Sequence, residues 1–487
     1  MTTPIRFPSS FACAPMLILA FFAAAMGTAV AAEPSAAAID ALIPKSIQGG
    51  MSLSIVHGDR VVYTKGYGWR DEGTPDKFIP EDKNYYGMPW QRKAAARAPA
   101  DPRTIYAIGS VTRQFTAAAI LLLSERHQLR LDDPVSRYAP EFSDSNLTLR
   151  MLLNQRSGLG DLNTLTFLQR VRPQARRPDG SLDVARIDRE IAALPRSFVP
   201  GARFEYNNSN YFVLGSIVER VTHQPLGQFL ATNIFRPLGM ARTAFATDAA
   251  VDDVAVGYRV DVKNALYRAY PWDLAWLGGA GAMTSTVEDL GRWNLALITH
   301  RVLQPTALAE MWHGIDAGHG QGSYAMGWIE DALGSHRYLW HNGQVGGFRA
   351  LNVIFPSDDL AFAILTNNQD AKPEYLLPGI ASLYFPVSGL DRILPRSGEV
   401  LIEASLAVGL GALAIAIVAI VTLKRFILAG IGLAILALCA GFFLPTLVGF
   451  GWAGLAAITP TAVYLLTARF MPKRPVVPKK TIRRSRF

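Results

Sequence analysis

Apolar and polar residues alternate near the start of the chain, whereas the segment after it follows a helical period. The alternation runs from Met51 to Trp69 on both sides of Gly58-Asp59, which predicts a β-hairpin. From Ser110 onward, apolar residues such as Phe115 recur at helical spacing, and the predicted helix ends around His127 to Leu129. The polar, proline-bearing stretch between these elements, Arg70 to Asp101, is interpreted as a long loop or insertion.

Alternation returns late in the chain, between His336 and Asn367. Two apolar runs flank Pro356-Ser-Asp-Asp359, which predicts a second hairpin. Helical segments fill the region between the two hairpins. Strands at both ends with helices between them favour an α/β (α+β) fold, in which one antiparallel sheet is built from both ends and flanked by helices.

Two long apolar patterns lie outside this predicted domain, which we place at residues 33–395. Residues 1–32 have the layout of a secretory signal peptide: Arg6, an apolar run from Met16 to Val30, and small residues before Glu33. An uncleaved membrane anchor is the alternative interpretation of this segment. The signal peptide predicts that the domain is exported.

The C-terminal apolar region predicts three transmembrane helices, at residues 402–423, 426–444 and 447–468. Two spans would also fit hydropathy alone. If the domain lies outside the cell membrane, however, only a third span returns the basic tail, residues 469–487, to the cytoplasm. We therefore predict a multi-pass membrane protein with an extracytoplasmic, periplasmic catalytic domain and a cytoplasmic C-terminus.

The charge distribution changes what the net charge of +9 means. Ten basic residues and no acidic residue follow Ala404, so the first 403 residues carry a net charge of −1. Because this net charge is close to zero, we predict no nucleic-acid partner for the globular part. The only cysteines, Cys13 and Cys439, lie outside it, which excludes thiol catalysis and cysteine metal ligation in the domain.

Ser110 is the first candidate for chemistry, because it begins the predicted helix. A serine hydroxyl needs a nearby base, and the oxyanion that it creates needs two N–H donors. A helix N-terminus exposes amides and favours negative charge. The simpler alternative is that Ser110 only caps the helix.

Ser110 is accompanied by two further elements in a recognisable order. The three are Ser110 to Arg113, Tyr206-Asn207-Asn208 and His341-Asn342-Gly343. This order resembles the three motifs of the serine β-lactamase-related, penicillin-binding-protein-like family, in the branch with class C β-lactamases, D-alanyl-D-alanine carboxypeptidases and esterases. The matching flanking segments are Leu131-Asp-Asp-Pro-Val135, Met151-Leu-Leu-Asn-Gln-Arg-Ser-Gly-Leu159, Pro200-Gly201, Phe235-Arg-Pro-Leu-Gly-Met240 and Gly281-Ala-Met-Thr-Ser-Thr-Val-Glu-Asp289.

The resemblance implies a β-lactamase/transpeptidase-like fold with a helical subdomain, and it implies roles for individual residues. Ser110 would attack a carbonyl, and Tyr206 would exchange protons with the serine and the leaving group. Asn208 would hydrogen-bond the substrate or order the site. His341 would add a polar or cationic group opposite the serine. Gly343 and Gln344 would contribute to substrate binding, with the backbone amides of Gln344 and Ser110 forming the oxyanion hole.

Arg113 departs from the family pattern, which has lysine at this position. A lysine can lose its proton and act as a base, whereas a guanidinium keeps its proton at physiological pH. If lysine is the obligatory base, the protein is inactive. If Tyr206 is the base and the cation mainly stabilises its charge, Arg113 can substitute for lysine electrostatically.

We therefore predict a membrane-anchored serine hydrolase that cleaves an amide or ester through a Ser110 acyl-enzyme, without metal or cofactor. Candidate substrates are a cell-wall D-amino-acid peptide, a β-lactam or a small ester. The expected partners are this small-molecule or peptide substrate and the lipid bilayer. The alternative is a pseudoenzyme that binds muropeptides or a membrane partner.

Overall fold

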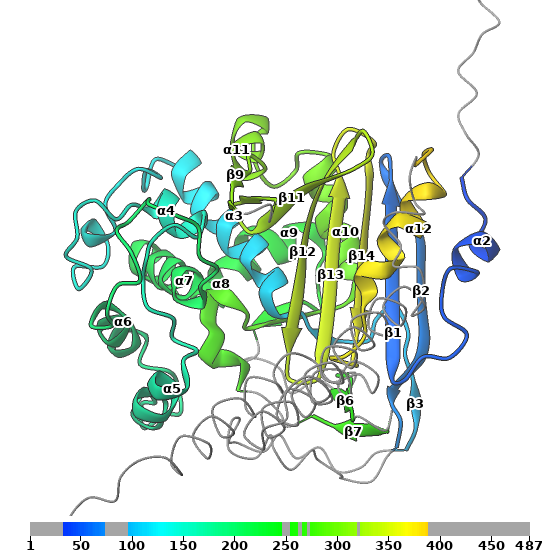
Figure 1. The fold of residues 1–487 in the computed structure, drawn as a ribbon, viewed down its shortest axis with the longest axis horizontal. Helices are drawn as coiled ribbons and strands as arrows, with labels where there is room; N and C mark the ends of the chain where they lie inside the picture. Colours follow the sequence, from blue (N-terminus) through cyan, green and yellow to red (C-terminus); the bar gives the residue numbers. More distant parts are fainter. Residues whose placement is uncertain are drawn as a thin grey trace, which may run out of the picture.

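Nine antiparallel strands form one sheet that joins the two ends of the described chain (Figure 1). The structure is a computed structural model that describes residues 33–73, 96–245, 254–261, 265–269, 273–318 and 322–387. The N-terminal and C-terminal strands are direct neighbours, with Met51 opposite Thr366. This confirms the predicted sheet built from both ends. The strand order is β3 (Ala98–Pro99), β2 (Arg60–Asp71), β1 (Gly50–His57), β14 (Leu360–Thr366), β13 (Phe348–Phe355), β12 (His336–Val345), β11 (Trp328–Leu333), β10 (Ser323–Ala325) and β9 (Ile315–Asp316).

The predicted N-terminal hairpin is confirmed, whereas the prediction for the C-terminal hairpin was incomplete. β1 and β2 flank Gly58-Asp59 as predicted. The segment from His336 to Asn367 contains three strands, because the chain also reverses at Gly346-Gly347 between β12 and β13. These glycines have φ angles of 55° and 90°, which glycine adopts without steric cost. The apolar residues on both sides of this turn masked it in the sequence pattern.

Helices cover both faces of the sheet. On one face, α2 (Ala36–Asp40) and α12 (Leu377–Ser382) pack on apolar side chains of the central strands, such as Leu53 and Ile364 (Figure 1). On the other face, α10 (Val287–Ile298) lies against β1 and β14, and α3 (Thr112–Glu125) joins the same core. Strand β14 is buried along its whole length because both faces are covered.

A helical subdomain extends from the α3 side of the sheet, as the resemblance implied (Figure 1). Its core is continuous with the core around α3. Three short strands form a separate small sheet, with β8 between β4 and β5. The remaining described α-helices and strands are α4 (Leu149–Leu153), α5 (Leu165–Val171), α6 (Val184–Ala192), α7 (Asn208–Thr222), α8 (Leu226–Leu230), α9 (Arg236–Leu238), α11 (Pro305–Met311), β4 (Tyr106–Ala107), β5 (Ala244–Phe245), β6 (Tyr258–Val260), β7 (Leu266–Arg268) and β8 (Met283–Ser285).

Several predictions fall on residues that the structure does not describe. The signal peptide at 1–32, the three spans between 402 and 468 and the tail at 469–487 lie outside the described residues. So does most of the insertion, although its ends are strands: β2 continues to Asp71, and β3 is Ala98–Pro99. Within the part that is described, every helix is too short or too polar to cross a membrane.

Candidate active site

Ser110 lies in a 3-10 turn, Gly109–Val111, that runs directly into α3. The predicted helix therefore begins with a tighter turn, and it ends at Glu125, with His127 in the left-handed conformation just beyond. No side chain caps the N-terminus of α3. Among the described residues, nothing forms a hydrogen bond with the half-buried Ser110 hydroxyl. The arrangement therefore does not support the helix-cap alternative.

Two glycines bring the backbone of β12 against the Ser110 turn. Gly109 has a φ of 50°, and a Cβ at this position would lie 2.9 Å from the backbone nitrogen of Gln344. A Cβ on Gly343 would collide with the Ile108 carbonyl and would lie 3.1 Å from the backbone nitrogen of Ser110. The backbone nitrogens of Ser110 and Gln344 therefore lie close to one another, in the region predicted for the oxyanion hole.

The edge of β12 is available for this contact because its neighbour ends early. Strand β11 pairs with β12 only as far as Trp340, which lies opposite Ile329. Within the described sheet, the rest of β12, from His341 to Val345, has β13 on one side and the Ser110 turn near the other. The third motif, His341-Asn342-Gly343, therefore lies on the part of β12 that does not pair with β11.

Arg113 links α3 to the Tyr206-Asn207-Asn208 element. One terminal nitrogen donates a short hydrogen bond to the Tyr206 hydroxyl, and the other donates to Asn208 Oδ1 at 2.7 Å. The guanidinium carbon also lies 4.4 Å from the centre of the Tyr206 ring and 5.3 Å from that of Tyr211. Arg113 is fully buried, and none of the described carboxylates pairs with it. Its charge is therefore balanced by neutral oxygens and aromatic faces.

Asn208 is held between a cation and an anion. Its oxygen accepts from Arg113, and its amide nitrogen donates to Asp161 Oδ2 at 3.3 Å. The preceding residue, Asn207, caps α7 by accepting from the backbone N–H of Ser209 at 2.7 Å. Sequence reasoning missed Asp161, although it follows the Ser157-Gly158-Leu159 part of a matched flanking segment.

His341 lies beside Tyr206, with ring centres 6.0 Å apart. Burial and the nearby Arg113 charge lower the pKa of His341 to about 3, so the ring is neutral at physiological pH. Its Nδ1 lies 2.6 Å from the Asn342 carbonyl, which can only accept, so Nδ1 carries the proton. Of the two roles predicted for His341, a polar or a cationic group opposite the serine, the structure thus favours the polar one.

Tyr324 is a second residue that the sequence did not reveal. Its hydroxyl lies 3.4 Å from Nε2 of His341, and since Nδ1 carries the imidazole proton, Tyr324 is the donor. The Tyr324 ring also lies 6.3 Å from that of Tyr206, and burial raises the pKa of the Tyr324 hydroxyl. Tyr324 belongs to a three-residue strand without a motif, so only its position in the fold identifies it.

These contacts bring all the predicted residues to one region. Arg113 donates hydrogen bonds to Tyr206 and Asn208, and the His341 ring lies beside Tyr206. Gly343 and Gln344 lie against the Ser110 turn. Over the described residues, His, Cys, Asp and Glu side chains form no cluster suited to a metal. The arrangement can supply a serine hydroxyl, two backbone N–H donors and a tyrosine paired with a permanent cation, which are the groups that acyl transfer needs.

Curated relatives are similar in sequence over most of the domain. Protein flp of Staphylococcus aureus (strain COL) is 26% identical over 343 residues, which is 68% of this chain and 62% of that protein. The match thus spans less than two thirds of its length. The putative penicillin-binding protein PbpX of Bacillus subtilis (strain 168) is 28% identical over 330 residues, or 67% of this chain and 72% of that protein.

Solved structures share the fold. The octameric penicillin-binding protein homologue from Pyrococcus abyssi matches with a TM-score of 0.56 and 26% identity, over 69% of this chain and 73% of that chain. A D-stereospecific amidohydrolase from Streptomyces sp. matches with a TM-score of 0.57 and 22% identity, over 72% of this chain and 99% of that chain. The second likeness supports the fold alone.

The family model described as Beta-lactamase matches residues 39–383, which is more than half of the chain. This range includes Ser110, Tyr206 and His341. It also includes both hairpins and the helical subdomain. The chain belongs to the beta-lactamase family, whose relatives here include penicillin-binding-protein-like proteins.

Proposed function

We propose that this protein is a membrane-anchored serine hydrolase that cleaves an amide or ester through an acyl-enzyme on Ser110. The observation that carries this proposal is the pair of hydrogen bonds from Arg113 to Tyr206 and Asn208. With a permanent cation against its oxygen, Tyr206 has a partner that compensates the negative charge of a phenolate. This supports Tyr206 as the base and makes a lysine base unnecessary.

The reaction would proceed in two steps. In the first, Tyr206 as phenolate takes the Ser110 proton while Ser110 Oγ attacks the carbonyl, and the backbone N–H groups of Ser110 and Gln344 stabilise the oxyanion. Tyr206 then gives the proton to the departing amine or alcohol. In the second, water attacks the acyl carbonyl and gives a proton to Tyr206, and Tyr206 returns this proton to Ser110 Oγ as the acid product leaves. His341, held neutral, would orient the substrate as a polar group.

The rival proposal is a binding protein that retains the cleft without turnover. One observation favours it: the Ser110 hydroxyl has no hydrogen bond to Arg113, to Tyr206 or to any other described residue. A nucleophile that does not contact its base would have to move to react. Its ligand would be a muropeptide or a membrane partner.

The deciding experiment uses the full-length protein, intact-mass spectrometry, a fluorophosphonate probe and, separately, penicillin. We expect a fluorophosphonate adduct that is absent in Ser110→Ala. A penicillin adduct would place β-lactams or related D-amino-acid peptides among the substrates. If the folded protein forms no adduct with either compound, the binding-only proposal replaces this one.

Restoring the family lysine tests the proposed part of Arg113. We expect Arg113→Lys to slow fluorophosphonate labelling by up to about 100-fold, because one ammonium cannot reproduce two divergent hydrogen bonds in a site adapted to a planar fork. Arg126→Lys is the matched control. Arg126 directly follows α3 and donates to an asparagine, Asn233, at 2.8 Å, but it is exposed and lies at the opposite end of α3 from Ser110. Labelling that rises from zero in Arg113→Lys would instead show a decayed site.

Anchoring and export remain part of the proposal and rest on the sequence outside the described residues. The apolar runs between 402 and 468 and the basic tail support three spans with the C-terminus in the cytoplasm. An outward-facing site near the bilayer would favour cell-wall or lipid-linked substrates. A reporter enzyme fused after Phe487 tests the topology, and a signal from outside the membrane would contradict it.

A further inference from the structure

One face of β12 carries a polar cluster whose side chains the proposed reaction does not use. Asn342 and Gln344 share this face, because successive side chains of a strand alternate between its two faces. Arg349 lies directly opposite Gln344 in the register of β12 and β13. Glu374 joins the cluster from a 3-10 turn, η7 (Pro373–Leu376), which lies between β14 and α12. Residues far apart in the sequence therefore meet beside the strand of the third motif.

An ion pair joins these side chains to one another. Glu374 Oε1 accepts from Asn342 Nδ2 at 3.0 Å and from Arg349 Nη2 at 2.8 Å. Arg349 Nη1 donates to Gln344 Oε1 at 2.8 Å. The side chains of Arg349 and Glu374 are 11% and 22% exposed, so this pair is screened by salt less than a surface pair would be. The pair thereby restrains the residues on both sides of Gly343.

The restrained segment has few other constraints. Gly343 has no side chain, and the chain reverses shortly afterwards at Gly346-Gly347. Over residues 341–345, β13 is the only strand that pairs with β12 among the described strands. Glycine loses more conformational freedom on folding than any other residue, so this backbone depends on outside contacts for a fixed position. A fixed position matters here, because an N–H donor stabilises an oxyanion only from about 2.7–3.1 Å.

We propose that Glu374 is a positioning residue, which fixes β12 so that the backbone N–H of Gln344 lies beside Ser110. It acts through Asn342 and Arg349 and does not touch the reacting atoms. The inference rests on the proposed function, because it gives Glu374 a part in stabilising the oxyanion. Glu374 Oε2 is buried and has no hydrogen-bond partner among the described residues. Both contacts therefore need only Oε1, which a glutamine would also supply.

The rate of fluorophosphonate labelling of the full-length protein tests the proposal. We expect Glu374→Leu to lower the maximal labelling rate about 10- to 100-fold, because a displaced N–H donor stabilises the transition state less. The probe concentration that gives half of this rate should stay within about twofold, since the cleft still binds the probe. Glu374→Gln should label at nearly the rate of the unmodified protein. An unchanged rate in Glu374→Leu, or an equal loss in both variants, would overturn the proposal.

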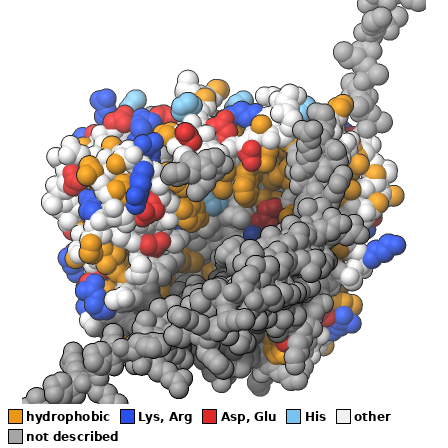
Figure 2. All heavy atoms as spheres, in the orientation of Figure 1, with side chains coloured by type: hydrophobic (Ala, Val, Ile, Leu, Met, Phe, Trp, Pro, Cys, Tyr) orange, Lys and Arg blue, Asp and Glu red, His pale blue; other side chains and the backbone are white. Residues whose placement is uncertain are grey.

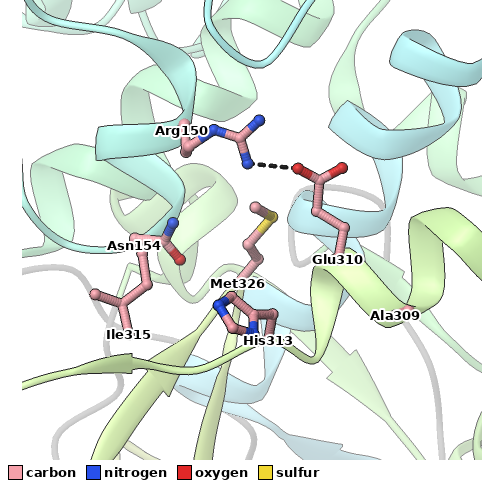
Figure 3. A pocket seen from close by; sticks show the side chains of 7 residues that line it. All are labelled: Arg150, Asn154, Ala309, Glu310, His313, Ile315 and Met326. Atoms are coloured by element: carbon pink, nitrogen blue, oxygen red, sulfur yellow. Dashed lines mark hydrogen bonds and ion pairs between the residues drawn. The ribbon is translucent and has the colours of Figure 1, made fainter.

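Glu310→Leu is the matched control. Glu310 also pairs with an arginine, Arg150, and this pair lines a cavity of about 400 Å³ between α4 and α11 (Figure 3). Among the described residues, the Glu310 side chain hydrogen-bonds only to Arg150, which has no part in the proposed reaction. We expect Glu310→Leu to label at the rate of the unmodified protein. A loss as large as that of Glu374→Leu would refute a local effect on β12.

A double variant, Asn342→Ala with Gln344→Ala, decides the question if Glu374→Leu does not fold. Asn342 is partly exposed and Gln344 is exposed, so both side chains can be shortened without opening a cavity in the core. The change removes both contacts with β12 and leaves the Arg349–Glu374 pair intact. We expect the same fall in the maximal labelling rate as for Glu374→Leu. An unchanged rate would contradict the proposal.

Hydrogen–deuterium exchange separates this inference from the proposed function. We expect the peptide that contains Gln344 to exchange faster in Glu374→Leu than in the unmodified protein or in Glu310→Leu. If the unmodified protein forms no adduct, the proposed function fails, but faster exchange would still show that Glu374 positions this part of β12. Unchanged exchange in the peptide would overturn the inference, whether or not the protein is labelled.

Discussion

Arg113 and Arg220 both lie inside the helical half of the domain, but their charges are balanced in different ways. Arg220 donates to Glu141, to Asp188 at 2.9 Å and to Ser216 at 3.3 Å, so two carboxylates surround it. Arg113 is fully buried, and among the described residues its guanidinium hydrogen-bonds only to Tyr206 and Asn208. The charge of Arg220 is therefore offset by two carboxylates, whereas the Arg113 site has a positive charge for which the described protein supplies no carboxylate.

The difference indicates what each arginine is for. A buried cation without an anion costs desolvation energy that its neutral partners only partly repay. Such an environment is poorly suited to holding a fold together, but it favours a negative charge that forms or binds nearby. The surface of the visible helical part shows no comparable excess of one charge, because basic and acidic side chains are interspersed over it (Figure 2).

The largest expected effect on stability comes from Arg220. Replacing it in Arg220→Met leaves the buried Asp188 and the neighbouring Glu141 without their cation, and we expect a loss of about 1–3 kcal/mol in the free energy of unfolding. Urea denaturation of the full-length protein measures this loss. A change below about 1 kcal/mol would mean that the cluster is not the structural element described here.

The pH dependence of stability should differ in sign between the two regions. Burial raises the pKa of Asp188 to about 7, so its contribution is present below about pH 4 and is lost as the pH rises through 7. The pKa of His341, beside Arg113, is lowered to about 3, so its contribution is present above about pH 6.5 and is lost as the pH falls towards 3.

Two variants measure these opposite slopes, each of which is at most about 1.4 kcal/mol per pH unit. Relative to the unmodified protein, Asp188→Asn should gain stability as the pH rises from 4 to 7. His341→Gln should gain stability as the pH falls over the same range. Urea denaturation at several pH values supplies the comparison, and relative stabilities that do not vary with pH would remove the distinction between the regions.

The smallest expected effect on stability comes from Arg113 itself. In Arg113→Met, an apolar side chain retains the contacts with the Tyr206 and Tyr211 rings and removes an unpaired buried charge. We expect the free energy of unfolding to stay within about 1 kcal/mol or to increase, measured alongside Arg220→Met under the same conditions. A loss as large as that of Arg220→Met would show that Arg113 is structural.

The sequence predicted those parts of the fold that depend on local pattern. Alternation identified the first hairpin, and helical spacing identified α3, because each element exposes one periodic face to the core. The reversal at Gly346-Gly347 was missed, since the apolar residues around it continue the strand pattern. Grouping Ser110, Tyr206 and His341 required the family resemblance, because their proximity arises from strand and helix packing across more than two hundred residues.

The remaining site features depend on burial, which a single sequence does not display. Asp161 became visible only through its contact with Asn208, and Tyr324 only through its position against His341. The neutrality of His341 likewise follows from enclosure and from the charge of Arg113. A motif can therefore identify which residues meet, whereas their protonation states depend on what encloses them.

The contact between the Ser110 turn and Gly343-Gln344 also determines when the site can exist during biosynthesis. At a synthesis rate of roughly 5–20 residues per second, β12 follows Ser110 from the ribosome by about ten to fifty seconds. Until then the serine has no second amide donor, and β1 still lacks β14, its partner in the sheet. If Ser110 is the nucleophile that we propose, a nascent or truncated chain that ends before β12 would carry it without the second amide that stabilises an oxyanion. Hydrolysis would then begin only when the domain is almost complete.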